Sequence, residues 1–122
     1  MKLGPATPIF RMFDEDRARD FYVRWIGCSV LFEHRFGPDM PLYLGLQRDG
    51  FILHLSGHSG DTTPGTRIRV VCDNITGLYD DLQSRPESSL RLGPPQMQSW
   101  GDIELALTDP FGNRITFYEE GT

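Results

Sequence analysis

The amino-acid sequence predicts an α+β fold built from two β-α-β-β-β modules. Three observations carry this prediction: strand-like runs outnumber helical ones, their order repeats after about 55 to 60 residues, and a loop of Gly, Ser, Thr and Pro separates the repeats. We expect a single domain over residues 1–122, with module 1 at about 5–56, a linker at 57–65 and module 2 at about 66–120.

Module 1 begins with the short apolar run ATPIF, which leads into a segment with helical spacing. Its apolar residues fall on one helical face: Phe21, Tyr22, Trp25 and Ile26. Asp14 or Asp16 can cap this helix, and Gly27 can end it. Three strand-like runs follow, SVLFEHRF, LYLGLQ and FILHLS, and Asp49-Gly50 between the last two predicts a tight hairpin.

Module 2 repeats this order. TRIRVVCD predicts its first strand, and Asp73 ends that strand as Asp14 ends the first strand of module 1. NITGLYDDLQSR predicts a helix, and SLRLG, DIELALTD and NRITFYEE predict three strands. Pro110 and Gly112 indicate a turn between the last two strands. Proline and serine interrupt the pattern over residues 84–97, so the sequence does not define the structure there.

Each module has a curled sheet and only one helix, which covers one face of the sheet and leaves the concave face open. Pairing two modules, within a chain or between chains, closes the concave faces over a cleft. We therefore expect a curled mixed sheet around a cleft, with the function located in that cleft.

Charge and composition exclude several classes of partner. The net charge is −5 and the basic residues are scattered, which argues against a nucleic-acid partner; the acidic charge fits a cationic ligand or simply solubility. Cys28 and Cys72 lack CxxC spacing, so we expect buried free thiols rather than a disulfide framework or zinc site. With no signal-peptide pattern and no membrane-spanning run, a cytoplasmic protein without a membrane partner is expected.

Several motifs resemble the vicinal oxygen chelate superfamily, which includes glyoxalase I, extradiol dioxygenases, fosfomycin-resistance enzymes and bleomycin resistance proteins. They are ATPIF before a helix containing FY, and SWG, whose Trp100 stands nine residues before the DPFGNRITF segment that begins at Asp109. The WG…LTDPFGN segment is most similar to bleomycin resistance proteins. The resemblance spans nearly the whole chain and implies a glyoxalase-like fold.

The resemblance also identifies the positions where metal-using relatives carry their ligands. In this sequence they hold Thr7, His54, Arg67 and Thr116. Only His54 is a ligand-type residue, whereas a divalent cation needs about three, and Arg67 places a permanent positive charge there. We therefore expect no metal, no cofactor and no catalytic residue. The alternative is a metal-dependent lyase, isomerase or dioxygenase of the glyoxalase type.

Candidate ligand-binding residues are those that strand alternation or the resemblance aims at the cleft. They are Phe36, Tyr43, His54, Ser56, Arg67, Arg69, Trp100, Glu104 and Thr116. Structural alternatives stay open: a hydrogen-bonded histidine, a core indole, and an ion pair between Glu104 and the arginines. Ser56, His58 and Asp61 lack the GxSxG context of a nucleophilic triad.

The sequence thus predicts a homodimer whose two clefts sequester a flat, polar small molecule without chemistry. The resemblance points to an antibiotic such as bleomycin, although Arg67 and Arg69 would oppose that cationic drug unless they are neutralised. Pro8 is a candidate for an arm exchanged between subunits, or a simple edge-strand proline. A module that recognises another protein is a third hypothesis, favoured by an exposed apolar patch and a filled cleft.

Overall fold

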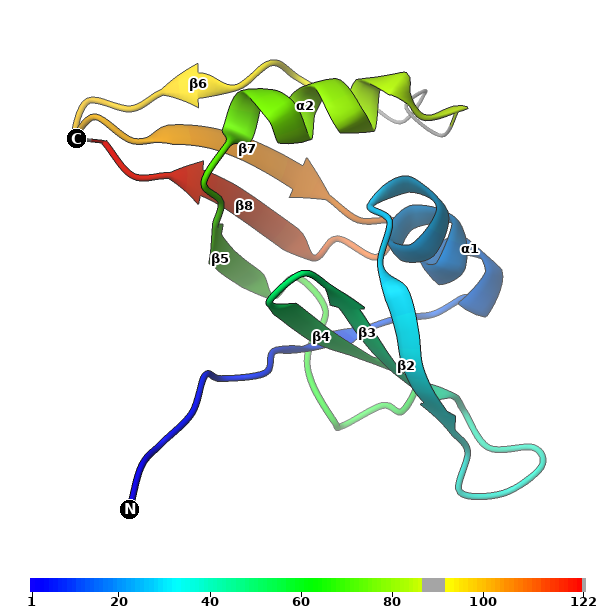
Figure 1. Ribbon diagram of the computed structural model, residues 1–122. Coiled ribbons are helices and arrows are strands. Elements are labelled where there is room, and N and C mark those ends of the chain that lie inside the picture. The colour runs from blue at the N-terminus through cyan, green and yellow to red at the C-terminus, as the bar shows by residue number, and fades with distance from the viewer. Residues whose placement is uncertain (87–91, 122) are drawn as a thin grey trace.

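A computed structural model, which describes residues 1–86 and 92–121, confirms the predicted α+β class and the repeated β-α-β-β-β order (Figure 1). The strands form two separate four-stranded sheets, one in each half of the chain. Each sheet is mixed: its edge strand, β1 or β5, runs parallel to its neighbour, whereas the other pairs are antiparallel. The residues of the predicted linker, 57–65, connect the two sheets.

The first half contains β1 (Ile9–Arg11), α1 (Glu15–Arg19), a π-helical continuation η1 (Asp20–Trp25), β2 (Ser29–His34), β3 (Tyr43–Arg48) and β4 (Phe51–Ser56). Its sheet has the order β1-β4-β3-β2. The carboxylate of Asp14 caps α1 by accepting a hydrogen bond from the Arg17 amide at 2.9 Å. Gly27 has a φ of 85° just after the π-helical turn, which agrees with its predicted role at the helix end.

The second half contains β5 (Arg67–Val71), α2 (Ile75–Ser84), β6 (Gln96–Met97), β7 (Ile103–Thr108) and β8 (Arg114–Glu119), in the sheet order β5-β8-β7-β6. The expected strand SLRLG falls largely on residues 87–91, which lie outside the described residues. The strand that pairs with β7 is β6, closer to Trp100 than expected. The cap of α2 is Asn74, one residue beyond Asp73, and its side chain accepts from the Gly77 amide at 2.9 Å.

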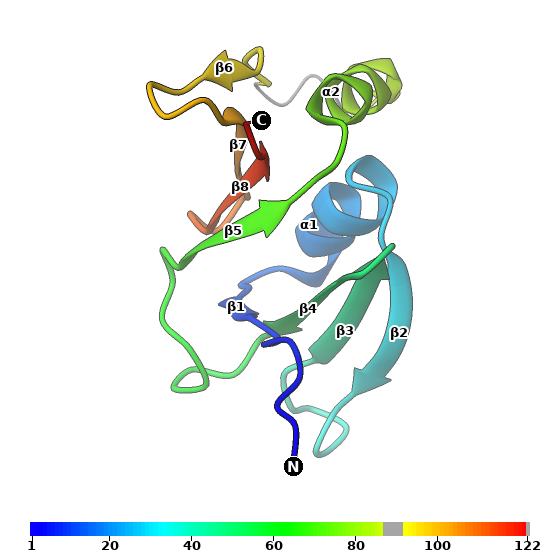
Figure 2. The same cartoon turned by 60° about the vertical axis from the view of Figure 1, so that its left-hand side comes forward.

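A single hydrophobic core joins the two modules. Helix α2 packs on β7 and β8, and the helical segment α1–η1 contributes its buried side chains to the core. Among the described residues, no helix covers the opposite face of either sheet (Figure 2). The indole nitrogen of Trp25 donates to the Leu82 carbonyl at 3.0 Å, which connects η1 to α2. The rings of Phe51 and Phe117 meet edge to face at 6.1 Å between β4 and β8. The helices and the inner sheet faces therefore form the contact between the modules.

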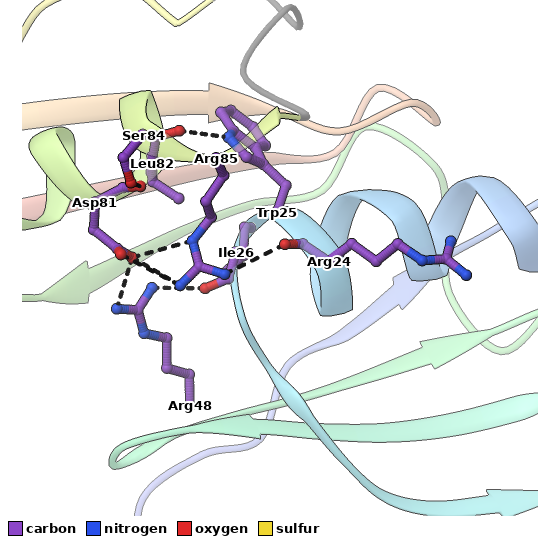
Figure 3. Close-up of polar contacts among 8 residues, drawn as sticks. All are labelled: Arg24, Trp25, Ile26, Arg48, Asp81, Leu82, Ser84 and Arg85. Atoms are coloured by element: carbon purple, nitrogen blue, oxygen red, sulfur yellow. Dashed lines mark hydrogen bonds and ion pairs between the residues drawn. The ribbon is translucent and has the colours of Figure 1, made fainter.

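An arginine-rich joint reinforces this contact (Figure 3). The carboxylate of Asp81 on α2 accepts from Arg48 of β3 at 3.1 Å and from Arg85 at 3.0 Å. The two guanidinium groups also donate to module 1 carbonyls, those of Ile26 and Arg24 respectively. Burial opposes the charge of Asp81, but the hydrogen bonds from Arg85 and Arg48 outweigh it and lower the pKa of Asp81.

The turn between β7 and β8 is a second joint between the modules. The buried carboxylate of Asp109 accepts from the amides of Phe111 and Asn113 at 2.8 Å, from the Asn113 side chain at 2.9 Å and from the hydroxyl of Tyr22 at 2.6 Å. Burial, and then the nearby Asp109, raise the pKa of Tyr22 well above its ordinary value. All of these carboxylate bonds lie within the protein, so the turn has a structural role.

The thiol groups and the lengths of the helices bear on the expected redox state and on membrane association. Both cysteines are free thiols, Cys28 buried and Cys72 half-buried, and burial raises the pKa of Cys28 to about 11. Among the described residues, no helix combines the length and the apolar character that crossing a membrane requires.

Candidate functional site

The uncovered face of the first sheet carries an aromatic cluster of Phe32, Tyr43 and His54. The Tyr43 hydroxyl and His54 Nδ1 are 2.8 Å apart, in hydrogen-bond contact. The Phe32 and Tyr43 rings are nearly parallel with centroids 6.1 Å apart, and the His54 ring meets both edge to face at 5.2 and 5.3 Å. These rings form a partly exposed aromatic surface with polar atoms beside it, on which a flat ligand can stack.

Gly45 makes this arrangement possible because it pairs with both Phe32 and His54 in the sheet. The Phe32 ring lies directly over Gly45, so a Cβ there would come closer than 3.0 Å to the ring. We expect Gly45→Ala to displace Phe32 and to destabilise the protein by about 1–2 kcal/mol. Near-ultraviolet circular dichroism and urea unfolding measure both effects.

Gly50 provides the matched control for this substitution. It lies in the turn of the same hairpin, no other side chain or distant backbone atom stands within 4 Å of the position that a Cβ would take, and its φ is not positive. Gly50→Ala should therefore leave the aromatic circular dichroism signal unchanged. Equal effects of the two substitutions would show that the contact with Phe32 does not matter.

Ser56 and Phe36 lie beyond this cluster. The Ser56 hydroxyl is buried, donates to the carboxylate of Asp61 at 2.6 Å and accepts from the backbone amide of His58 at 3.1 Å. His58 thus contacts Ser56 through its amide, and no nucleophilic triad is formed. Phe36 is 73% exposed at the end of the sheet, and its ring packs against those of His34 and His58.

The Tyr43 hydroxyl, in contrast, belongs to the aromatic cluster. Burial and the charge of Asp61 raise the pKa of this hydroxyl.

The uncovered face of the second sheet carries charged residues and one aromatic ring. The Arg69 guanidinium donates to Glu104 at 2.8 Å, lies 3.8 Å from Asp102 and stacks over the Tyr118 ring at 4.4 Å. The hydrogen bond to Glu104 is the main cause that raises the pKa of Arg69. Arg69 thus forms the ion pair with Glu104 that the sequence left as an alternative. The carboxylates of Glu104 and Asp102 together neutralise its charge. Thr116 is buried beside Arg69 on the neighbouring strand.

Trp100 and Arg67 are exposed, as is Arg69, but unlike Arg69 they have no carboxylate partner among the described residues. Trp100 is 62% exposed in the turn between β6 and β7, so its indole is not part of the core of the chain. Arg67 is exposed on β5 and lies beside Arg114 of β8. Both positions are accessible to a ligand.

Within one chain, the predicted residues fall into two groups rather than one cleft. Tyr43, His54 and Ser56 lie on the first sheet, whereas Arg67, Arg69, Glu104 and Thr116 lie on the second. A cavity of about 1130 Å³ lies between the β3–β4 hairpin, β5 and the start of α2, but only Pro8 and Arg69 of the predicted set line it. Its other lining residues include Arg48, Phe51, Ile52, Val70 and Leu78.

Three residues with a place in the site were missed by the sequence analysis: Phe32, Arg114 and Tyr118. Arg114 and Tyr118 stand two positions on either side of Thr116, so strand alternation places them on the face already assigned to Thr116. Phe32 has a weaker signal, because its place over Gly45 depends on the pairing of β2 with β3 and on a bulge between Val30 and Phe32.

The residues at the family's metal positions do not fit a divalent cation. Nδ1 of His54 is already in contact with Tyr43, and Thr116 and Arg67 supply neither carboxylate nor imidazole. Within residues 1–86 and 92–121, no three His, Cys, Asp or Glu side chains are grouped as a metal site requires. We therefore assign no step of chemistry to a metal ion.

The repeated module and the two uncovered sheet faces define the class of protein. The chain matches the family model of glyoxalase superfamily proteins over residues 2–122 and so belongs to the glyoxalase superfamily, which confirms the resemblance found in the sequence. No curated protein matches the chain in sequence.

Solved structures with the same fold include two proteins connected with bleomycin. A bleomycin resistance determinant encoded on the transposon Tn5 is 24% identical, with 97% of this chain and 98% of that chain covered and a TM-score of 0.75. A bleomycin-binding protein in complex with bleomycin is also 24% identical, with 97% and 99% covered and a TM-score of 0.74. TnmS3, an antibiotic binding protein from Streptomyces sp. CB03234, is 23% identical, with 99% of each chain covered and a TM-score of 0.74.

Proposed function

We propose that this protein binds a flat, polar small molecule without a metal ion and sequesters it, in the manner of a bleomycin resistance protein. The observation that carries the proposal is the pair of uncovered sheet faces, each with aromatic and polar side chains outside the core. The bleomycin-binding and antibiotic-binding proteins with the same fold support it. Such a protein acts by enclosing its ligand stoichiometrically, so no reacting group is needed.

In this proposal the ligand contacts come from both sheets. The rings of Phe36, Tyr43 and Trp100 stack on the ligand. The side chain of His54 offers hydrogen bonds, and the buried Ser56 and Thr116 lie beneath the ligand. Arg67 supplies charge, and the ion pair of Arg69 with Glu104 offers its outer polar edge. The chain acts as a single domain of two modules joined by residues 57–65. The expected cytoplasmic location and the absence of nucleic-acid and membrane partners stay predictions.

A homodimer is proposed because the two sheet faces are uncovered within one chain. In a dimer with twofold symmetry, a cleft made from two copies of the same module would lie on the axis, so two equivalent clefts require module 1 of one chain to face module 2 of the other. Exposed apolar side chains on and beside β2 support burial in such an interface: Val30, Leu31, Phe32, Phe36 and Met40. The same side chains would serve a protein-recognition module, which is the rival hypothesis.

Pro8 stays a candidate for the exchanged arm. Its carbonyl accepts from the His54 amide at 3.0 Å, and the residues before it are exposed. β1 is an edge strand of only three residues, so β4 continues beyond it at Phe51–Leu53, where no strand of the described residues pairs with it on that side. Pro8 has no N–H to donate to β4, so the strand pairing begins only at Ile9. An arm of the second subunit would fit the same edge.

Native mass spectrometry with bleomycin as the probe, together with metal analysis of the same sample, tests the proposed function. We expect two drug molecules per metal-free dimer. We also expect Trp100→Ala to weaken binding by roughly five- to tenfold, because loss of a stacked aromatic costs about 1 kcal/mol. Met97→Ala, which removes another exposed apolar side chain, is the control and should bind normally. A stoichiometric divalent metal without bound drug would contradict sequestration and favour the glyoxalase-type enzyme.

A further inference from the structure

Two arginines lie side by side on the uncovered face of the second sheet. Arg67 of β5 and Arg114 of β8 are register partners in the parallel pair of these strands. On both strands the intervening residues, such as Ile68 and Ile115, pack in or against the core, so the two guanidinium groups extend from the opposite face. Arg114 is held in register by its amide, which donates to the Thr66 carbonyl at 2.8 Å.

Neither of these side chains has an ion pair or a hydrogen bond within the described part of the chain, although acidic residues outnumber basic ones by 17 to 12. Other arginines do have a carboxylate partner: Arg19, Arg24, Arg35, Arg48, Arg69 and Arg85. The carboxylate of Asp109, close to Arg114 in the sequence, already accepts hydrogen bonds within its own turn and from Tyr22. Like charges on directly neighbouring strand positions repel each other, and no carboxylate of the described residues is paired with either arginine to relieve that repulsion.

We propose that Arg67 and Arg114 form an anion-binding pair that selects ligands carrying a carboxylate, sulfonate or phosphate group. A guanidinium binds such oxyanions through two parallel hydrogen bonds, and an anion between two arginines also relieves their repulsion. The neighbouring hydroxyl of Thr108, the register partner of Arg114 on β7, adds a further donor. Arg69 is different, because Glu104 and Asp102 already neutralise its charge.

The inference rests on the proposed function and gives it a ligand class. The ligand is a flat aromatic molecule with an anionic group at one end, so that its ring stacks on the aromatic side chains while its anion lies against Arg67 and Arg114. Bleomycin, a cation, would meet this pair unfavourably. We therefore expect it to bind more weakly than an anionic or zwitterionic ligand of the proposed class, even where it fills both clefts.

Isothermal titration calorimetry with three probes of similar shape tests the pair: 1-naphthalenesulfonate, neutral 1-naphthalenemethanol and cationic 1-naphthylmethylammonium. The wild-type protein should bind the sulfonate roughly tenfold more tightly than the alcohol, and the cation most weakly. The double variant Arg67→Gln/Arg114→Gln should bind the sulfonate and the alcohol equally well. Its melting temperature should be unchanged or higher, because a repulsive pair has been removed.

Lys2→Gln/Arg17→Gln is the charge-matched control, since both residues are exposed and their side chains have no partner among the described residues. This control should keep the preference for the sulfonate. If the preference survives in the Arg67/Arg114 variant, or disappears equally in the control, the anion pair is refuted while ligand binding stands. If none of the probes and no bleomycin binds to the wild type, the proposed function fails, and the anion pair falls with it.

Discussion

Replacing Asp109 with alanine is expected to lower the free energy of unfolding by about 3 kcal/mol or more. The substitution leaves the buried Tyr22 hydroxyl and the Asn113 side chain, together with the amides of Phe111 and Asn113, without the acceptor that they share. Each unsatisfied buried donor costs about 1–3 kcal/mol, although relaxation and water recover part of the sum. Urea unfolding followed by circular dichroism measures the loss.

Two further variants make the Asp109 result interpretable. Tyr22→Phe removes only the bond from Tyr22 to the Asp109 carboxylate and should cost about 1 kcal/mol, because the carboxylate keeps its three bonds within the turn. Asp39→Ala removes an exposed turn aspartate for which the structure gives no hydrogen bond, and it should change stability by no more than about 0.5 kcal/mol. An Asp109→Ala protein as stable as Asp39→Ala would show that the turn does not hold the modules together.

Replacing Trp25 with alanine should destabilise the protein by about 3–5 kcal/mol, the range for removing a large aromatic side chain from a core. Trp25 is fully buried, meets the Phe21 ring edge to face at 5.2 Å, and donates its indole N–H to the Leu82 carbonyl. Its loss leaves a cavity and removes the indole hydrogen bond to the Leu82 carbonyl where the two modules meet. Urea unfolding of Trp25→Ala beside the wild type checks the magnitude.

The other tryptophan supplies the control for Trp25. Trp100 is mostly exposed, so Trp100→Ala should leave the free energy of unfolding within about 0.5 kcal/mol of the wild-type value. A loss below about 1 kcal/mol for Trp25→Ala would contradict a shared core between the modules. Trp25→Phe keeps most of the packing, and it leaves Trp100 as the single tryptophan whose fluorescence reports ligand binding.

The features that the sequence predicted well depend on neighbouring residues. Helical and alternating spacings located the helices and most strands, because each pattern reflects which side of one element is buried. Asp49, in the Asp49-Gly50 hairpin, has a φ of 52°, which aspartate tolerates and a tight turn requires. Gly27 ends the first helical segment for a similar local reason. Such signals do not depend on the rest of the fold.

The features that were missed depend on contacts between distant segments. The hydrogen bond between Tyr22 and Asp109 joins residues 87 positions apart, and no local sequence pattern predicts it. The π-helical turn of η1 and the position of β6 are also unmarked by residue periodicity. For the candidate site, alternation placed the side chains on the sheet faces that point away from the core, but the partners of Arg69 and the pairing of Arg67 with Arg114 required the register of β5 and β8. Charge compensation is therefore the part of the site that the sequence leaves open.

The two uncovered faces belong to different modules, and this arrangement has a genetic consequence in the proposed dimer. Each cleft takes module 1 from one chain and module 2 from the other. A lesion at His54 in one chain and a lesion at Arg67 in another then leave a mixed dimer with one cleft that carries both defects and one that carries none. Alleles damaged in different modules would complement each other in the same cell, whereas alleles damaged in the same module would not.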